Sequence, residues 1–267
     1  MPTSEELRAG PYLKLKRARH HINDLSGQID AFLAQHPFKL IVQFKRKAGQ
    51  VVFRTKTDKP IPPCFSLIIG DAVHNLRSAL DLTIFGMVKD RRNVRLRDVQ
   101  FPFVRKKNGL ERAIEKGQIE FAGEKVVKAV HDLQPYCDGN KELWGLNSLD
   151  ARDKHRLLVI ARYVPELSVD AIDAVVGKIA KIRLIGKNAT ITYTGPEDKP
   201  ILVFGANFVT RNLANTEKEA DVQPAFGVCF GEGLPFENCL IIETLHSLTK
   251  ETTRAVDNLI DAYVSQG

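Results

Sequence analysis

Four long segments of this chain place an apolar residue at every third or fourth position, and this period constrains the fold more than any other feature. Such spacing puts the apolar side chains on one face of an α-helix, which must then be buried against another element. The long helices predicted in this way are residues 11–35, 65–89, 140–163 and 240–264. Two shorter helices are predicted at residues 108–117 and 122–133.

Strand-like segments lie between and after these helices. Residues 40–44 and 51–55 are rich in β-branched and aromatic side chains and flank a short basic segment, which predicts a β-hairpin with a basic tip. Further strands are predicted at residues 174–185, 189–194, 201–209 and 225–230. The polar residues 211–221 are predicted to be loop.

The order helix, hairpin, helices, strands, helix predicts an α+β fold. We expect a helical bundle with an N-terminal β-hairpin and a C-terminal antiparallel sheet packed on it, closed by a long C-terminal helix. Matching apolar stripes on the terminal helices favour a single compact unit over residues 1–267. The alternative is a mainly helical domain at 1–165, followed by a strand-rich domain with the C-terminal helix at 166–267.

Positive charge is concentrated in the first part of the chain. The net charge is +7 overall, but residues 1–110 carry 21 Lys and Arg against 9 Asp and Glu, a net of +12. The basic clusters lie at residues 14–21, 45–47, 89–97 and 105–107. Because each neutralised phosphate releases counterions, such clusters favour a polyanion such as nucleic acid. A solvated basic surface, or an acidic protein surface as partner, is the alternative.

Composition and the absence of several motifs exclude other classes of protein. No apolar run reaches the ~18 residues of a membrane helix, and the first 21 residues lack the apolar core of a signal peptide. We therefore expect a cytoplasmic protein with no membrane partner. The four cysteines have no metal-ligand spacing, and we expect them to be reduced and buried. Glycine-rich phosphate loops and the GxSxG and HExxH motifs are absent, so no cofactor is predicted.

One face of the predicted helix 65–89 carries the residues best suited to chemistry. Six polar side chains fall within about 160° of the helix circumference, opposite the apolar stripe. They are Asp71, His74, Asn75, Arg77, Ser78 and Asp81. A solvated face is usually rich in Glu, Lys and Gln, because these residues favour helix. Short side chains with directional hydrogen bonds indicate a site or a buried polar seam instead.

A second polar cluster lies at residues 150–156. Asp153 falls in the middle of the apolar face of its predicted helix, where an unpaired carboxylate is costly. We expect it to pair with Arg77 or His74 across a helix interface. His155 projects to another side of the helix.

Two interpretations of these clusters differ in kind. In the structural one, an ion pair between Asp153 and Arg77 sets the register of the packed helices. In the catalytic one, His74 is a general acid–base and Arg77 stabilises anionic charge, a pairing suited to phosphodiester cleavage. Asp153 would then orient either side chain, and His155 and Arg156 would join them.

Metal binding by Asp71, His74 and Asp81 is a third interpretation. One helix spreads these three ligands over about three turns, which is too far for one ion without another element. Asp150 or His155 would have to contribute, and no metal site is predicted.

Four motifs resemble a known family. They are GDAVHNLRSALD at 70–81, VQFPF at 99–103, LQPY at 133–136 and LWGLNSLDARDKHR at 143–156. Together they resemble a broad family of uncharacterised bacterial and phage-associated proteins, with GDxxHNLRxALD and DKHR as its motifs. The resemblance covers residues 11–163 and implies no particular function.

The helix pattern is also similar to that of HEPN domains, which are helical bundles of RNA-cleaving toxins and defence proteins. This weaker resemblance implies a bundle of four or five helices and ribonuclease chemistry. HEPN ribonucleases carry an Arg, a polar residue, a short spacer and a His on one helix. Here Leu82 stands where a four-residue spacer after Arg77 would place the His.

The leading hypothesis is a protein that binds nucleic acid or cleaves RNA. If it is an enzyme, we expect a phosphodiesterase or ribonuclease-like hydrolase with His74, Arg77, Asp153 and His155 as candidate catalytic residues. The alternative is a non-enzymatic module for a ligand or a protein partner, in which the polar face holds helices together. A homodimer is a further hypothesis.

Overall fold

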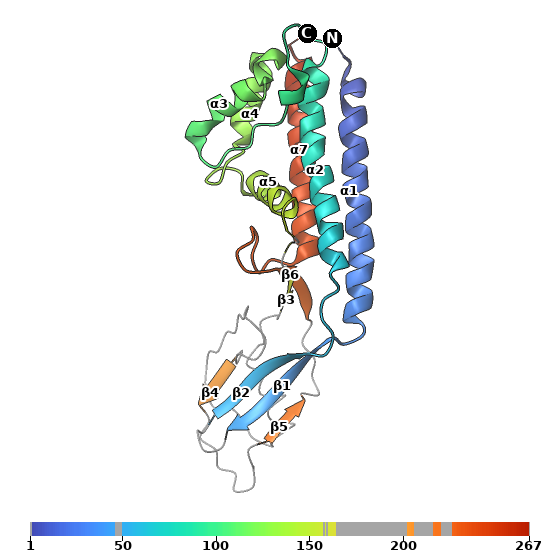
Figure 1. The fold of residues 1–267 in the computed structure, drawn as a ribbon, viewed down its shortest axis with the longest axis vertical. Helices are drawn as coiled ribbons and strands as arrows, with labels where there is room; N and C mark the ends of the chain where they lie inside the picture. The colour runs from blue at the N-terminus through green and yellow to red at the C-terminus, as the bar shows by residue number, and fades with distance from the viewer. Residues whose placement is uncertain are drawn as a thin grey trace. The chain divides into compact units, whose positions relative to one another are not determined.

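The computed structural model describes residues 2–45, 50–156, 158, 160–163, 202–205, 216–219 and 226–266. Its α-helices are α1 (Ser4–Leu33), α2 (Cys64–Val88), α3 (Leu110–Lys116), α4 (Glu124–Leu133), α5 (Lys141–Asp153) and α7 (Ile241–Val264). Short 3₁₀ turns are η2 (Leu96–Asp98), η3 (Lys107–Gly109) and η4 (Ile119–Ala122). The strands are β1 (Phe38–Lys45), β2 (Gln50–Thr57), β3 (Ile160–Tyr163), β4 (Leu202–Gly205), β5 (Thr216–Glu219) and β6 (Gly227–Phe230). The α+β class is confirmed (Figure 1).

The chain divides into two compact units, each built from separate segments. One unit holds Met1–Gly27, Pro63–Val159 and Phe230–Gly267. The other holds Gln28–Pro62 and Ile160–Cys229. The chain therefore returns to the first unit after the second, because its C-terminal helix belongs with the N-terminal ones. The single domain over residues 1–267 and its alternative, divided near 165, stay predictions.

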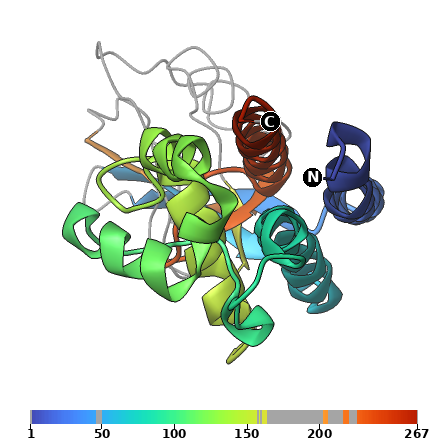
Figure 2. The ribbon, with the colours of Figure 1, turned by 90° about the horizontal axis from the view of Figure 1, so that it is seen from above.

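The first unit is a helical bundle in which α1, α2 and α7 run side by side (Figures 1 and 2). The apolar stripe of α2 is buried as its period predicts, with Ile69, Leu76 and Leu80 fully inaccessible to solvent. Helix α2 packs against both α5 and α7. Tyr263 near the end of α7 is buried as well.

The first helix begins earlier than predicted. Residue 11 was the expected start, but α1 runs from Ser4 with Pro11 inside it. The Thr3 hydroxyl accepts a hydrogen bond from the Glu6 amide at 3.2 Å, while the Glu6 carboxylate accepts from the Thr3 amide at 2.7 Å. This capping box satisfies amide groups that the first turn leaves without helical partners.

The predicted helix 140–163 is too long. Helix α5 ends at Asp153, and the chain turns before residues 160–163 form strand β3. Strand β3 pairs with β6 in a two-stranded sheet. A β-branched and aromatic segment such as Ile160–Tyr163 suits a strand once a pairing partner is available.

The predicted hairpin forms, but it does not stand apart from the later strands. Strands β1 and β2 pair antiparallel with Phe38 opposite Thr57, and β4 and β5 add to the two edges. The result is one four-stranded sheet in the order β4-β2-β1-β5. Strand β5 lies in a segment predicted to be loop, so that prediction was wrong. The strands predicted at 174–185 and 189–194 lie outside the described residues.

No helix in the described part of the chain is long and apolar enough to cross a membrane. The burial predicted for the cysteines holds for Cys229, whereas Cys64 and Cys239 are exposed.

A close approach at Gly145 of α5 provides a test of the bundle packing. A Cβ atom added at Gly145 would overlap the ring of Phe236, in the segment that follows β6. We expect Gly145→Ala to lower the free energy of unfolding by roughly 1–2 kcal/mol, because the cost of moving the half-buried ring outweighs the preference of alanine for helix. Urea denaturation measures this change.

Gly27→Ala is the matched control, since nothing lies within 4 Å of a Cβ added there. Because alanine favours helix over glycine, this variant should be more stable by about 0.5–1 kcal/mol. Equal effects of the two substitutions would contradict the packing described for Phe236.

Candidate functional site

Helices α2 and α5 bring the two predicted polar clusters together. Helix α2 contributes His74 and Ser78 from its polar face, and α5 contributes Asp150 from a position between its buried leucines. Lys154 caps the C-terminal end of α5. These four residues form what we call the His74 group.

The centre of the His74 group is the carboxylate of Asp150, which is 4% exposed. Its Oδ1 lies 3.1 Å from Nδ1 of His74, and its Oδ2 lies 2.6 Å from Nζ of Lys154. A neutral imidazole that donates from Nδ1 to a carboxylate carries its lone pair on Nε2. The buried Asp150 thus selects the tautomer of His74 and holds the ring in one orientation.

The other ring nitrogen of His74 is available for chemistry. The His74 side chain is 56% exposed, so solvent or a ligand reaches it from one side. Nε2 lies 3.5 Å from the hydroxyl of Ser78, one turn further along α2. An exposed base with a buried orienting carboxylate is an arrangement able to transfer protons.

Arg77 belongs to a different set of contacts. Its guanidinium forms an ion pair with Asp81, donates from Nε to Asn147 at 3.2 Å and lies 4.4 Å from the ring centre of Phe103. Asp81 also accepts a hydrogen bond from the Phe101 amide at 2.8 Å. Arg77 and Asp81 therefore bind the segment containing VQFPF to α2 and α5.

The predicted ion pair between Asp153 and Arg77 is wrong, because Arg77 pairs with Asp81. Asp153 makes no hydrogen bond or ion pair within the described part of the chain. Its carboxylate instead lies directly against Gly70, where any added Cβ would overlap it. Asp153 was predicted to lie in the apolar face, but it is the last residue of α5. The buried carboxylate is that of Asp150, one turn earlier.

Burial is the main cause that raises the pKa of Asp153 above its usual range, followed by repulsion from Asp150 and then Asp71. Attraction to His74 acts in the opposite direction. Asp153 is therefore close enough to the His74 group to share its electrostatic field.

His155 lies outside this arrangement. It follows the end of α5 and is exposed, as is Arg156. Within the described residues, no hydrogen bond or ion pair connects the His155 side chain to His74. The structure thus brings Asp153 near His74 and leaves Arg77 in the neighbouring set of contacts.

Asp150 is the residue whose role beside His74 the sequence did not indicate, since it was expected only as a contributor to a metal site. Its position beside Leu146 and Leu149, one turn before Lys154, was the available signal.

In the described parts of the chain, no group of three or more His, Cys, Asp or Glu side chains is arranged to hold a metal ion.

Comparisons with protein-family models, with curated proteins and with solved structures give no match to this chain. The likenesses to the DKHR-containing family and to HEPN domains stay predictions.

Asp153→Asn tests the electrostatic penalty at this site. The pKa of Asp153 is raised by folding, so its ionised form destabilises the fold at neutral pH, and protonation removes the penalty as the pH falls. We expect the Asn variant to have a higher Tm at about pH 7 and the difference to shrink near pH 4. Thermal unfolding followed by circular dichroism measures both. The exposed Asp138→Asn should show neither effect.

Arg77→Ala tests the structural set of contacts. The substitution leaves Asp81 without its cation and removes the packing on Phe103, so we expect a loss of roughly 1–3 kcal/mol in the free energy of unfolding. Urea denaturation provides the value, with the exposed Arg156→Ala as a control near zero. An Arg77 variant as stable as the control would show that this set does not hold the helices together.

Proposed function

We propose that this chain cleaves phosphodiester bonds in RNA, with His74 as the general acid–base. The observation that carries the proposal is the pairing of a buried carboxylate, Asp150, with a half-exposed imidazole whose second nitrogen faces outward. An imidazole is suited to proton transfer because its ordinary pKa is near neutrality.

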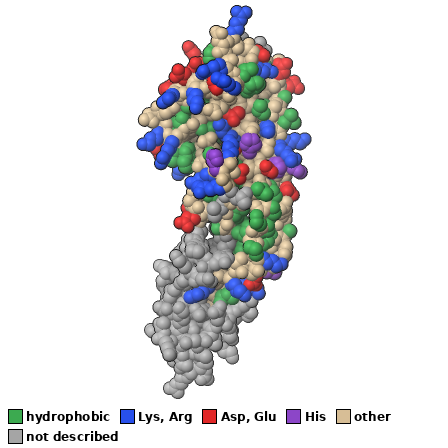
Figure 3. Space-filling view, in the orientation of Figure 1, with side chains coloured by type: hydrophobic (Ala, Val, Ile, Leu, Met, Phe, Trp, Pro, Cys, Tyr) green, Lys and Arg blue, Asp and Glu red, His purple; other side chains and the backbone are tan. Residues whose placement is uncertain are grey.

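The charge around the His74 group supports a polyanionic substrate. In α1, His21 lies close enough to Asp71 of α2 and to Arg17 for their charges to affect its pKa, which burial chiefly lowers. His21, at the end of the basic cluster 14–21, therefore lies near Asp71 on the polar face of α2. On the face of the bundle seen in Figure 3, Lys and Arg side chains are interspersed with Asp and Glu, and His side chains lie among them. The basic side chains on this face would attract phosphates and raise the rate of association.

The proposed roles follow from these positions. Nε2 of His74 accepts the proton of the RNA 2′-hydroxyl, which attacks phosphorus and displaces the 5′ oxygen. The displaced 5′ oxygen takes its proton from solvent, and Asp153 acts through its charge near His74. Lys154, rather than Arg77, is the cation that shares a carboxylate with His74. A HEPN-like bundle, a cytoplasmic location and a homodimer belong to the same proposal.

One observation favours a second candidate function, a non-enzymatic binding module. Arg77, Asp81 and Phe101 show that part of the polar face ties segments together. In that case the His74 group would also serve to hold α2 and α5 together, and the exposed side of His74 would contact a ligand without reacting.

Cleavage assays separate the two functions. Purified protein is incubated with labelled RNA and DNA, single- and double-stranded, in Mg²⁺ or in EDTA. We expect cleavage of RNA, and a loss of about 10²–10⁴-fold in rate for His74→Ala, because proton transfer typically contributes that much. Asp150→Asn should lower the rate as well, since it removes the carboxylate that orients the ring.

His131→Ala is the matched control, because His131 is also a partly exposed histidine paired with a carboxylate, Glu111, at 3.2 Å. It should leave the rate unchanged. RNA binding that falls steeply with salt but without cleavage would favour the binding module. Absence of both cleavage and salt-sensitive binding would overturn the proposal.

A further inference from the structure

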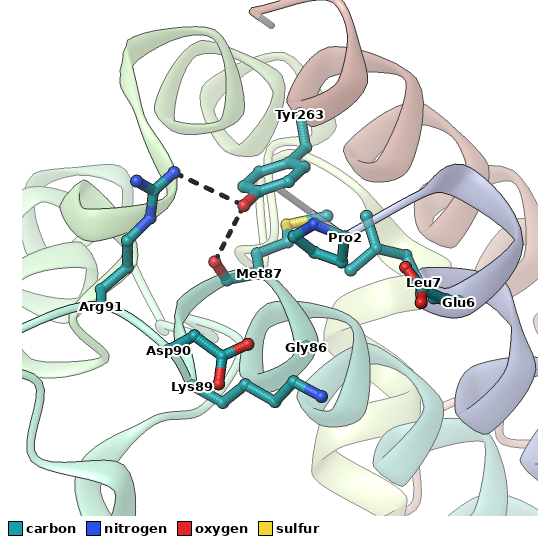
Figure 4. A pocket seen from close by; sticks show the side chains of 9 residues that line it. All are labelled: Pro2, Glu6, Leu7, Gly86, Met87, Lys89, Asp90, Arg91 and Tyr263. Carbon is teal, nitrogen blue, oxygen red and sulfur yellow. Dashed lines mark hydrogen bonds between the residues drawn. The ribbon is translucent and has the colours of Figure 1, made fainter.

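A cavity of 510 Å³ lies at the end of α2 that is far from Gly70. Residues from the start of α1 and the end of α7 also line it. The cavity is separate from the His74 group and independent of the proposed function. Its volume is in the range typical of small-molecule sites, about 300–1,000 Å³. Figure 4 shows the side chains that line it.

Part of the lining of the cavity is apolar. Leu7, Met87 and the ring of Tyr263 are each buried, and Pro2 lies beside them. Helices α1 and α2 approach closely here, since a Cβ added at Gly86 would be 3.2 Å from a methyl group of Leu7. Water bound to such a surface is displaced favourably by an apolar group.

One wall carries a guanidinium held in place by a buried partner. The Tyr263 hydroxyl donates to the Met87 carbonyl at 3.2 Å and accepts from Nη2 of Arg91 at 3.4 Å (Figure 4). Arg91 has five N–H donors in all, so most of them stay available to a carboxylate. Within the described residues Arg91 makes no salt bridge.

The other side carries a carboxylate that is also held in place. Both hydrogen bonds from Thr3 to Glu6 reach the same oxygen, Oε2, at 2.7 and 3.1 Å. No hydrogen bond to Oε1 is formed by any described residue. The bond from the Thr3 amide is the largest cause that lowers the pKa of Glu6, so the group is ionised at neutral pH. Figure 4 places Glu6 and Arg91 on opposite sides of the cavity.

We propose that this cavity binds a short molecule with a cationic end, an apolar middle and an anionic end, and that an apolar dipeptide with free termini fits it. The carboxylate of the ligand would meet Arg91, its ammonium group would meet Glu6, and its side chains would cover Leu7 and Met87. Opposite charges on facing walls favour an elongated zwitterion over a compact one.

The remaining charged groups of the cavity favour this class over a simple anion. Lys89 and Asp90 both line it, so its charged residues comprise two cations and two anions. Lys89 attracts Glu6 weakly, as a minor cause of its lowered pKa. A phosphate would be repelled by Glu6 and Asp90, whereas a zwitterion satisfies both signs at once.

Titration calorimetry with the dipeptide leucyl-leucine tests the site in the full chain. N-acetyl-leucyl-leucine lacks the cationic end and leucyl-leucine amide lacks the anionic end, and each should bind at least tenfold more weakly. Glu6→Gln should remove the penalty for N-acetylation, and Arg91→Gln should remove the penalty for the amide. Gln at position 6 still fits the capping box, so the charge changes without loss of the cap.

Neighbouring residues that do not line the cavity provide matched controls. Glu5→Gln and Arg92→Gln change the same charges one position away and should bind leucyl-leucine like the original chain. Tyr263→Phe keeps the ring and removes the partner of Arg91, and should weaken binding of leucyl-leucine but not of its amide. Circular dichroism checks that each variant is folded.

Three outcomes would overturn the proposal. They are an absence of leucyl-leucine binding, equal binding of the capped dipeptides, and equal effects of the paired Glu6 and Glu5 or Arg91 and Arg92 substitutions. None of them bears on RNA cleavage, so the two proposals fail independently.

Discussion

Burial of the Asp150 carboxylate between α2 and α5 is the interaction on which the candidate site depends. A carboxylate that is only 4% exposed must find partners, and it finds them in His74 and Lys154. These two bonds fix a side chain on each helix. The close approach at Gly70, where Asp153 occupies the space a Cβ would take, keeps the helices near enough for this geometry.

Helix α2 divides its polar residues between two tasks. His74 points to the buried carboxylate and to solvent, while Arg77, less than a turn away, turns toward Asp81, Asn147 and Phe103. The Arg77 set is mostly covered and ties down the segment before α3. The His74 group has an exposed nitrogen and an unpaired neighbour, Asp153, at an electrostatic cost. Costs of this kind are typical of places where function rather than stability selects the residues.

Much of this could be predicted from the sequence, because it follows from local periodicity. The apolar stripes located α2 and α7 within a few residues, and the β-branched segments located the hairpin. The polar face of α2 was recognised by its short, hydrogen-bonding side chains. The two misplaced helix ends have different causes. The capping box of Thr3 and Glu6, which is local, starts α1 before Pro11. The end of α5 depends on β3, which needs a partner strand that is distant in sequence.

The sequence by itself determined the α+β class, the long helices and the residues on each helix face, since these depend on spacing along one element. Only the tertiary structure decided which carboxylate meets which cation. The periodicity of α5 predicted Asp153 in the apolar face of the helix, but α5 ends at Asp153 and the buried residue is Asp150. The packing of α2 against α5 sets these pairings, and a Cβ atom at Gly70 would be enough to disturb them. The spacing of residues within a single helix therefore cannot predict them.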